Sequence, residues 1–105
     1  MNCVYMLLCN DQSFYTGWTN DLAARLAAHD EGTASKYTRS KRPLQCILVI
    51  YCNSATQARS VEAKIKRLQR KDKERILGDT DQMATALWKM TGETLYFARS
   101  FIGIE

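Results

Sequence analysis

The chain has 105 residues, of which 46% are hydrophobic and 25% are charged. This length fits one domain, and this composition is that of a globular protein, which excludes a disordered chain. Lys and Arg number 15 and Asp and Glu number 11, so the net charge is +4. A basic balance of this size permits a polyanionic partner but does not identify one.

The apolar opening segment, residues 1–10, is much shorter than the run of about 18 residues that a membrane-spanning helix needs. It also lacks the basic region and the cleavage site of a secretory signal. We therefore expect a cytoplasmic protein without a membrane partner.

The four cysteines have no C-x-x-C spacing and the chain has one histidine. This pattern favours buried free thiols over a zinc site.

The first third of the chain predicts a hairpin followed by a helix. Residues 2–9 are rich in Val, Tyr, Leu and Cys, which favours a strand. The turn residues at 10–13 and the resumed strand pattern at 14–18 complete a predicted hairpin. Asn20 is a suitable N-cap and Gly32 a suitable stop, so these two residues bound the predicted helix.

The middle of the chain predicts a loop, a strand and a long helix. Residues 33–43 are polar and basic and end in the only proline, which favours a loop. Residues 44–52 are almost continuously apolar, as expected of a strand buried on both faces. Ser54 and Gln57 resemble a capping box and open a helical pattern that continues to about Lys71.

A further short helix is predicted over residues 73–77, with Asp72 as its cap and Gly78 as its stop. The order of these elements predicts an α+β fold, with a small sheet packed by helices. Residues 79–105 carry little net charge and are expected to form a helical and apolar C-terminal extension. Its apolar side chains would be unusual in water, so we expect the extension to pack on the domain or to mediate self-association. These side chains are Trp88, Met90, Leu95, Tyr96, Phe97, Phe101 and Ile102.

Five polar or aromatic side chains are candidates for a common site. The apolar stripe of the first predicted helix includes His29 and leaves Arg25 on its flank. Tyr5 and Tyr15 lie on strands that are expected to pair, so their phenols can meet on one face. Glu62 lies at the edge of the apolar stripe of the long predicted helix.

Each of these side chains also has an ordinary structural interpretation. A half-buried tyrosine usually belongs to the core and has a satisfied hydroxyl, and a lone histidine on an apolar face is more often structural. Arg25 can be a solvated helix residue, and Glu62 can pair with Lys66 at i+4. Only the combination of all five distinguishes them from this background.

The combination resembles the GIY-YIG nuclease superfamily. "CVYML" is followed by "YTG", then by an arginine and a histidine on the next helix, and then by a glutamate on the long helix. The chain looks most like the small stand-alone bacterial branch, in which the motifs read V-Y and Y-T-G. "YTGWTNDLAARLAAH" and "SKYTRSKRP" match that branch best. The resemblance covers Asn2 to about Leu77. It implies a nuclease domain over residues 1–78, with a three-stranded, mainly antiparallel sheet packed by helices.

The resemblance also implies a role for each of the five side chains. Tyr5 matches the candidate general base and Tyr15 its hydrogen-bonded partner, and the two roles can be exchanged. Arg25 matches the arginine that stabilises phosphate charge, with His29 assisting. Glu62 matches the glutamate that holds one divalent cation, Mg²⁺ or Mn²⁺. Because a phenol with an ordinary pKa of about 10 is a poor base at neutral pH, a nearby cation is expected to lower the pKa of the tyrosine.

The chain departs from the family pattern at three positions. Cys3 stands where the first motif has its leading glycine, and Trp18 follows the second glycine where some members have a lysine. Glu74 stands where many members have an asparagine. These differences leave the five candidate residues intact and bear on substrate contacts and efficiency.

The leading interpretation is a metal-dependent endonuclease that hydrolyses DNA phosphodiester bonds, an activity expected in DNA repair. The first alternative is a nucleic-acid-binding module of the same fold with weak or lost chemistry. The second is a structural or partner-binding protein whose basic loop is merely solvated. For DNA binding, the expected contact is that loop, which clusters four cations and an aromatic side chain. Its residues are Lys36, Tyr37, Arg39, Lys41 and Arg42.

Overall fold

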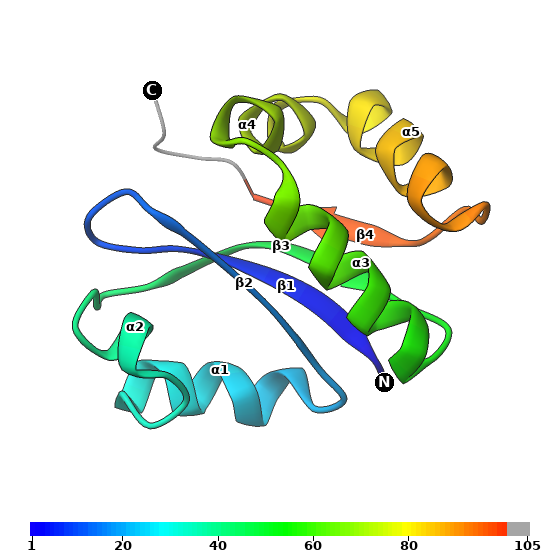
Figure 1. Ribbon diagram of the computed structural model, residues 1–105. Helices are drawn as coiled ribbons and strands as arrows, with labels where there is room; N and C mark the ends of the chain where they lie inside the picture. Colours follow the sequence, from blue (N-terminus) through cyan, green and yellow to red (C-terminus); the bar gives the residue numbers. More distant parts are fainter. Residues whose placement is uncertain (101–105) are drawn as a thin grey trace.

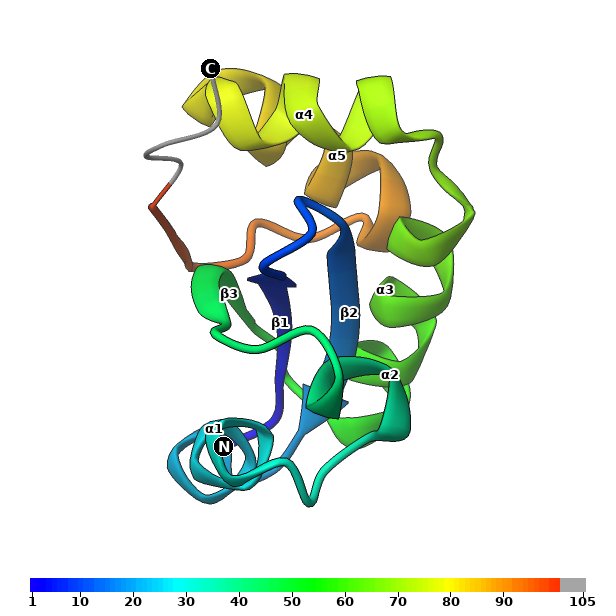
Figure 2. The same cartoon turned by 90° about the vertical axis from the view of Figure 1, so that its left-hand side faces the viewer.

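The computed structural model describes residues 1–100, which form one antiparallel sheet with helices on both of its faces. The elements in chain order are β1 (Cys3–Leu8), β2 (Phe14–Thr19), α1 (Leu22–Glu31), α2 (Lys36–Arg39), β3 (Gln45–Tyr51), α3 (Ala55–Arg67), α4 (Arg70–Gly78), α5 (Thr80–Thr91) and β4 (Phe97–Arg99). In Figures 1 and 2, α1 and α2 lie on one side of the sheet, and α3, α4 and α5 lie on the other.

The sheet confirms the α+β class but has four strands where the sequence predicts three. The strand order is β2-β1-β3-β4, and every neighbouring pair is antiparallel. The additional strand β4 pairs with the edge of β3, where Val49 lies opposite Ala98. β4 covers backbone groups of β3 that would otherwise form an open sheet edge. A strand of only three residues, far along the chain from its partner, leaves no periodic signal in the sequence.

The central strand β1 is buried on both faces, and its alternation separates two environments. Val4, Met6 and Leu8 face the main core beneath α3, α4 and α5, which also contains Val61 and Ile65. The alternate residues of β1, which include Tyr5, are equally buried on the side of α1. The strand therefore presents apolar side chains to the core and a phenol to the opposite layer.

The first helix begins one residue later than predicted, and a second helix follows it that was not predicted. The N-cap of α1 is Asp21, whose carboxylate accepts from the Ala24 amide at 3.1 Å; Asn20 precedes the cap. The short helix α2 lies in the segment predicted as a loop. It begins where the Ser35 hydroxyl accepts from the amides of Tyr37 and Thr38. One helical turn is too short to show a helical period in the sequence.

The predicted long helix is divided in two. Leu68 and Gln69 adopt extended conformations, so α3 ends at Arg67 and α4 begins at Arg70. Asp72 therefore lies in the first turn of α4 and is not its cap. The break lets α4 fold back, so that its buried residues reach the same core as α3. No glycine or proline marks this break, because tertiary packing and not local propensity produces it.

The cysteines and the extension complete the core. All four cysteines are free, and all but the half-buried Cys46 are buried. Met83 and Leu87 of α5 are fully buried in the main core, whereas Trp88 and Tyr96 are 56% and 75% exposed.

The domain boundary at residue 78 and self-association through residues 79–105 stay predictions, and Phe101 and Ile102 lie outside the described residues. Across residues 1–100, no helix has both the length and the apolar character needed to cross a membrane.

The burial of α5 predicts that Leu87 stabilises the whole domain. Leu87→Ala leaves a cavity in the core and is expected to lower the free energy of unfolding by about 2–5 kcal/mol. Trp88→Ala, at the neighbouring exposed position, is the matched control and should change it by less than about 0.5 kcal/mol. Urea unfolding followed by circular dichroism measures both variants. Equal stabilities for Leu87→Ala and the wild type would show that α5 does not share the core.

Candidate active site

The site is built on a buried hydrogen bond between β1 and α1. Tyr5 and His29 are each only 1% exposed, and the Tyr5 hydroxyl lies 2.8 Å from His29 Nε2. His29 is the buried residue of α1, so this helix meets the sheet through a polar contact.

Gly17 allows Tyr5 to reach His29. The two residues lie opposite each other in the β1–β2 pair, and the Tyr5 phenol crosses directly over the glycine. A Cβ atom at position 17 would lie 2.6 Å from the Tyr5 hydroxyl oxygen, which is a steric clash. The glycine of the Y-T-G motif is therefore required by the side chain opposite it, and not by an unusual backbone conformation.

A third residue, Thr38 of α2, fixes the protonation pattern of His29. Thr38 is fully buried, and its hydroxyl lies 2.9 Å from His29 Nδ1 and 3.4 Å from the Ser35 carbonyl oxygen. Because the carbonyl can only accept, the Thr38 hydroxyl donates to it and accepts from Nδ1–H. We therefore assign the proton of neutral His29 to Nδ1. Nε2 is then the acceptor for the Tyr5 hydroxyl.

The electrostatics of the pair keep both groups uncharged at neutral pH. Burial, assisted by the neighbouring Tyr15 phenol, raises the pKa of Tyr5 far above its ordinary value. The Arg25 guanidinium lowers this pKa, as the sequence interpretation expected, but burial outweighs it. Burial and the same guanidinium lower the pKa of His29. At neutral pH the pair is therefore a phenol that donates to a neutral imidazole, and the imidazole is the available proton acceptor.

Tyr15 and Tyr37 form the open side of the aromatic cluster. The Tyr15 ring lies 6.4 Å from the Tyr5 ring and 5.1 Å from the His29 ring, measured between centroids. Tyr37 stacks on Tyr15 at 6.1 Å, and its hydroxyl donates to Ser13 Oγ at 2.8 Å. The ring of Tyr37 is therefore already stacked on another ring of the protein. The role of Tyr37 in stacking on a base stays a prediction.

Arg25 and Glu62 lie on helices that cover opposite sides of the sheet. Arg25 on α1 is exposed, and its charge reaches Tyr5 and His29 because it lowers the pKa of both. Glu62 on α3 has a side chain that is 20% exposed and lies 3.6 Å from Lys66 Nζ. Its carboxylate raises the pKa of Tyr5, so its charge is also felt at the aromatic cluster. The charges of Arg25 and Glu62 therefore both act on the one buried phenol of Tyr5.

The donor set around Glu62 suits one kind of metal. Within residues 1–100, no three His, Cys, Asp or Glu side chains come close enough to hold a metal ion together. A single carboxylate leaves most positions of an octahedral cation to water and phosphate, which is how Mg²⁺ is usually bound. The residues present therefore fit a hydrated hard cation and do not fit zinc in an all-protein cage.

The predicted basic loop divides into two pairs of cations. Lys41 forms an ion pair with Asp11, and Arg42 donates to the backbone carbonyls of Arg39 and Asp30 at 3.0 and 3.1 Å. Lys36 and Arg39 are exposed and have no ion-pair partner in the described part of the chain. Only this second pair is available to an outside anion without the loss of a contact in the fold.

Sequence reasoning missed Gly17 and Thr38 as parts of the site. Both lie in stretches that carry the family resemblance, Gly17 in "YTG" and Thr38 in "SKYTRSKRP". Nothing local in the sequence shows that Thr38 meets a histidine nine positions earlier. The structure brings the two together because α2 packs on α1.

Comparison with known proteins identifies the family. The profile of the GIY-YIG catalytic domain matches residues 1–75. The chain therefore belongs to the GIY-YIG family. It is 44% identical over 73 residues to a UPF0213 protein of Clostridium perfringens, a match that covers 70% of this chain and 78% of the relative. It is 39% identical over 87 residues to a UPF0213 protein of Bacillus velezensis, covering 83% of this chain and 88% of the relative.

A solved structure shows the same fold. The solution NMR structure of a UPF0213 protein from Bacillus halodurans matches with a TM-score of 0.51 and 37% identity, and the match covers 74% of this chain and 84% of that one. Within the GIY-YIG family, the chain thus belongs with the small UPF0213 proteins.

The lowered pKa of His29 predicts a pH-dependent stability. In the unfolded chain histidine has a pKa of about 6.5, so below this pH the unfolded state takes up a proton that folded His29 resists. The free energy of unfolding should therefore fall as the pH is lowered from about 7 towards 5. His29→Gln removes the only histidine and should flatten this dependence, as measured by urea unfolding at a series of pH values. The prediction fails if both proteins show the same slope.

Proposed function

We propose that this protein is a metal-dependent endonuclease that hydrolyses the phosphodiester bonds of DNA. The observation that supports the proposal most directly is the buried hydrogen bond from Tyr5 to His29, with Arg25 and Glu62 on either side. Membership of the GIY-YIG family supports the same class of chemistry.

The hydrogen bond gives the proton of the attacking water a defined route. As the water oxygen forms a bond to phosphorus, the water passes a proton to the Tyr5 oxygen, and Tyr5 passes its own proton to His29 Nε2. The phenol is thus never ionised, which agrees with its raised pKa. The bond from phosphorus to the leaving oxygen breaks, and this oxygen takes a proton from solvent. His29 is then the net base, and Tyr5 relays the proton.

The charges around the pair act on the phosphate. Arg25 is placed to stabilise the negative charge that grows on the phosphoryl oxygens in the transition state. Glu62 would hold a divalent cation, Mg²⁺ or Mn²⁺, which when bound neutralises phosphate charge as a Lewis acid. The ion pair of Lys66 with Glu62 holds this carboxylate in place when no cation is present.

The alternative is a nucleic-acid-binding module with weak chemistry. One observation favours it: Lys66 already pairs with Glu62 at 3.6 Å, so a cation must compete with an ammonium group for the carboxylate. Cleavage and binding must therefore be measured separately.

The decisive variant is Glu62→Ala, because it removes the carboxylate proposed to hold the cation. We expect a fall in kcat of about 10²–10³-fold with little change in DNA affinity, since the cation acts mainly in the transition state. Asp81→Ala is the control, because Asp81 is an exposed carboxylate on α5, a helix that carries none of the five candidate residues. Cleavage of end-labelled DNA, with Mg²⁺, Mn²⁺ or a chelator, and fluorescence anisotropy give the two readouts.

Two outcomes contradict the endonuclease. Full cleavage by Glu62→Ala, in protein free of contaminating nuclease, would remove Glu62 from the mechanism. Binding by the wild type without cleavage at any metal concentration would favour the binding module.

A second prediction concerns the surface that holds DNA. Replacing Lys36 and Arg39 by alanine should weaken binding and reduce the slope of log affinity against log salt by about 1–2, because each phosphate contact contributes roughly 0.7–0.9. Lys71→Ala with Lys89→Ala removes two exposed lysines of α4 and α5 and serves as the control. Anisotropy titrations at several salt concentrations measure the slope. An unchanged slope in the first double variant would exclude α2 as the contact surface.

A further inference from the structure

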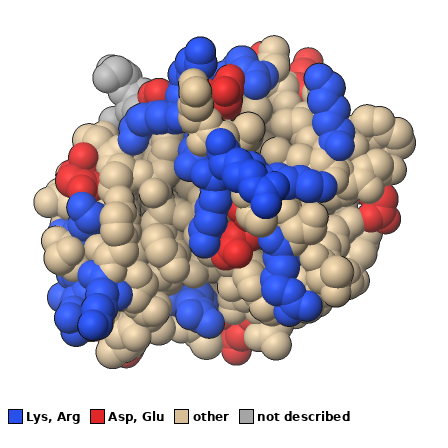
Figure 3. Space-filling model, in the orientation of Figure 1, with Lys and Arg blue, Asp and Glu red and all other residues tan. Residues whose placement is uncertain are grey.

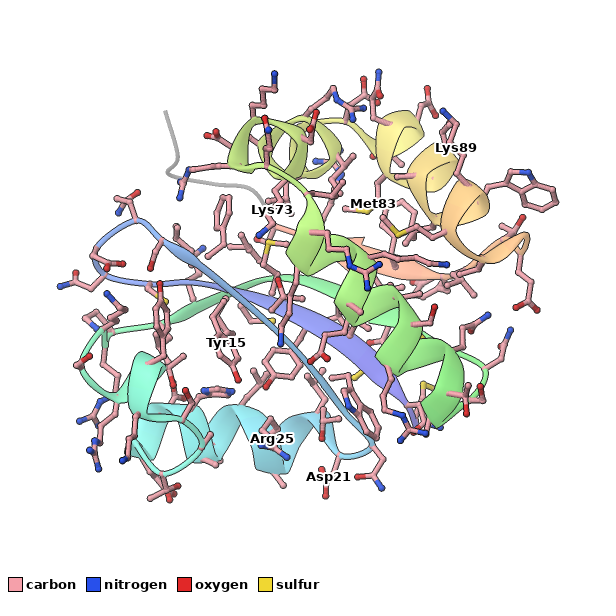
Figure 4. The ribbon with its side chains drawn as sticks, viewed as in Figure 1. Tyr15, Asp21, Arg25, Lys73, Met83 and Lys89 are labelled. Carbon is pink, nitrogen blue, oxygen red and sulfur yellow. The ribbon has the colours of Figure 1, made fainter. Side chains whose placement is uncertain are left out.

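A cleft of about 360 Å³ lies beside Tyr15, along β2, which is a strand at the edge of the sheet. It brings together residues from β2, α2, α3 and α4. Figure 4 labels two of these residues, Tyr15 on β2 and Lys73 on α4. The lining residues are Phe14, Tyr15, Thr16, Tyr37, Lys66 and Lys73. No carboxylate belongs to this lining, so its charge is positive.

Thr16 is the first sign that the cleft takes a ligand. The residue is only 4% exposed, and its hydroxyl oxygen has no hydrogen-bond partner among the described residues. A buried hydroxyl without a partner costs free energy, so such groups are normally paired. Because Thr16 lines the cleft, a ligand in the cleft can supply the missing partner.

The two lysines show which charge the ligand carries. Lys66 pairs with Glu62 at 3.6 Å, and its side chain is 54% exposed. Lys73 is half-buried and has no acidic partner in residues 1–100. Burial, and after it the Arg70 guanidinium, disfavours the charged form of Lys73 and lowers its pKa. An anion beside Lys73 would favour its charged form and so offset both effects.

The aromatic side chains of the cleft are not available to stack on a base. The Arg70 guanidinium lies over the Phe14 ring at 4.1 Å, and Tyr37 stacks on Tyr15 and has Lys41 over its ring at 4.8 Å. The groups that remain free to bind are therefore a hydroxyl and two ammonium groups. Such groups recognise a phosphate and not the identity of a base.

We propose that this cleft binds a phosphate of the nucleic-acid strand next to the phosphate that is cut. The inference rests on the proposed function, because Tyr15 lines the cleft and also packs against Tyr5 and His29. The Thr16 hydroxyl donates to a phosphate oxygen, while Lys66 and Lys73 neutralise the charge. The strand then runs across β2, between α2 and the junction of α3 with α4. Figure 3 shows Lys and Arg side chains gathered over both of these regions.

The test compares substrates with one phosphate and with several. Thr16→Val preserves the shape of the side chain and Lys73→Ala removes one cation; Lys71→Ala, on an exposed position of the same helix, is the control. Bis(p-nitrophenyl) phosphate is a phosphodiester with no neighbouring phosphate, whereas a single-stranded oligonucleotide has several. We expect both variants to lose about tenfold more kcat/KM on the oligonucleotide than on the small diester. Equal losses on the two substrates would overturn the proposal.

Thr16→Val also separates binding from structure. Because its hydroxyl has no partner in the fold, the variant should keep or raise the melting temperature while it weakens binding of the oligonucleotide. A lower melting temperature with unchanged affinity would assign Thr16 a structural role and overturn its place in the site.

A binding measurement distinguishes this proposal from the proposed function. If the wild type cuts neither substrate, the endonuclease is contradicted. The affinity for the oligonucleotide still tests whether the cleft binds a phosphate of the strand. Lys73→Ala should then weaken affinity and reduce the salt slope by about 1. Inorganic phosphate, titrated against ¹⁵N-labelled protein, tests the other source of the same chemistry. The strand subsite would be overturned if inorganic phosphate saturated the shift of the Thr16 amide signal and the oligonucleotide did not compete with it.

Discussion

The hydrogen bond from Tyr5 to His29 is the contact on which the arrangement of the site depends. It joins the central strand β1 to α1. Because His29 is the buried residue of α1, this hydrogen bond is made by the part of the helix that lies deepest in the fold. Two further features are needed to make the contact. Gly17 leaves room for the phenol to cross β2, and Thr38 holds the imidazole from its far side. A polar contact of this kind is stable in the interior only because each of its groups has a partner.

Burial dominates the chemistry of this contact. Charge from Arg25 favours an ionised phenol, but the loss of water around Tyr5 disfavours it more strongly. The same burial keeps His29 neutral. The site therefore combines an un-ionised donor with an uncharged acceptor, and a proton can move along it without a charge ever being isolated on the phenol. The charged groups, Arg25 and Glu62, lie at the periphery, where water or substrate can compensate them.

The face of the sheet opposite α1 is organised by apolar packing instead. The main core joins β1 and β3 to α3, and α4 and α5 complete it from above. The division between α3 and α4 lets both helices contribute to this core, and β4 covers one edge of the sheet. The cationic cleft lies where this half of the molecule meets β2, so the aromatic cluster and the cleft are adjacent, with Tyr15 as their shared wall.

The sequence by itself determined the features that depend on neighbouring residues. The hairpin, the stop of α1 at Gly32, the cap of α3 at Ser54 and the apolar stripe through Val61 follow from local propensity and periodicity. The motif spacing identified the family and brought Tyr5, Tyr15 and His29 into one hypothesis. Periodicity placed Arg25 and Glu62 beside the apolar stripes of their helices, and the resemblance supplied a role for each of them.

Only the tertiary structure decided which groups meet. The contact of Thr38 with His29, the clash that reserves position 17 for glycine, the pairing of β4 with β3 and the unpartnered hydroxyl of Thr16 all join residues that local patterns do not relate. The pKa of Tyr5 likewise depends on how completely it is buried, and here burial reversed the expected direction. Propensities act over a few residues, whereas desolvation and hydrogen-bond partners are set by the whole packed fold.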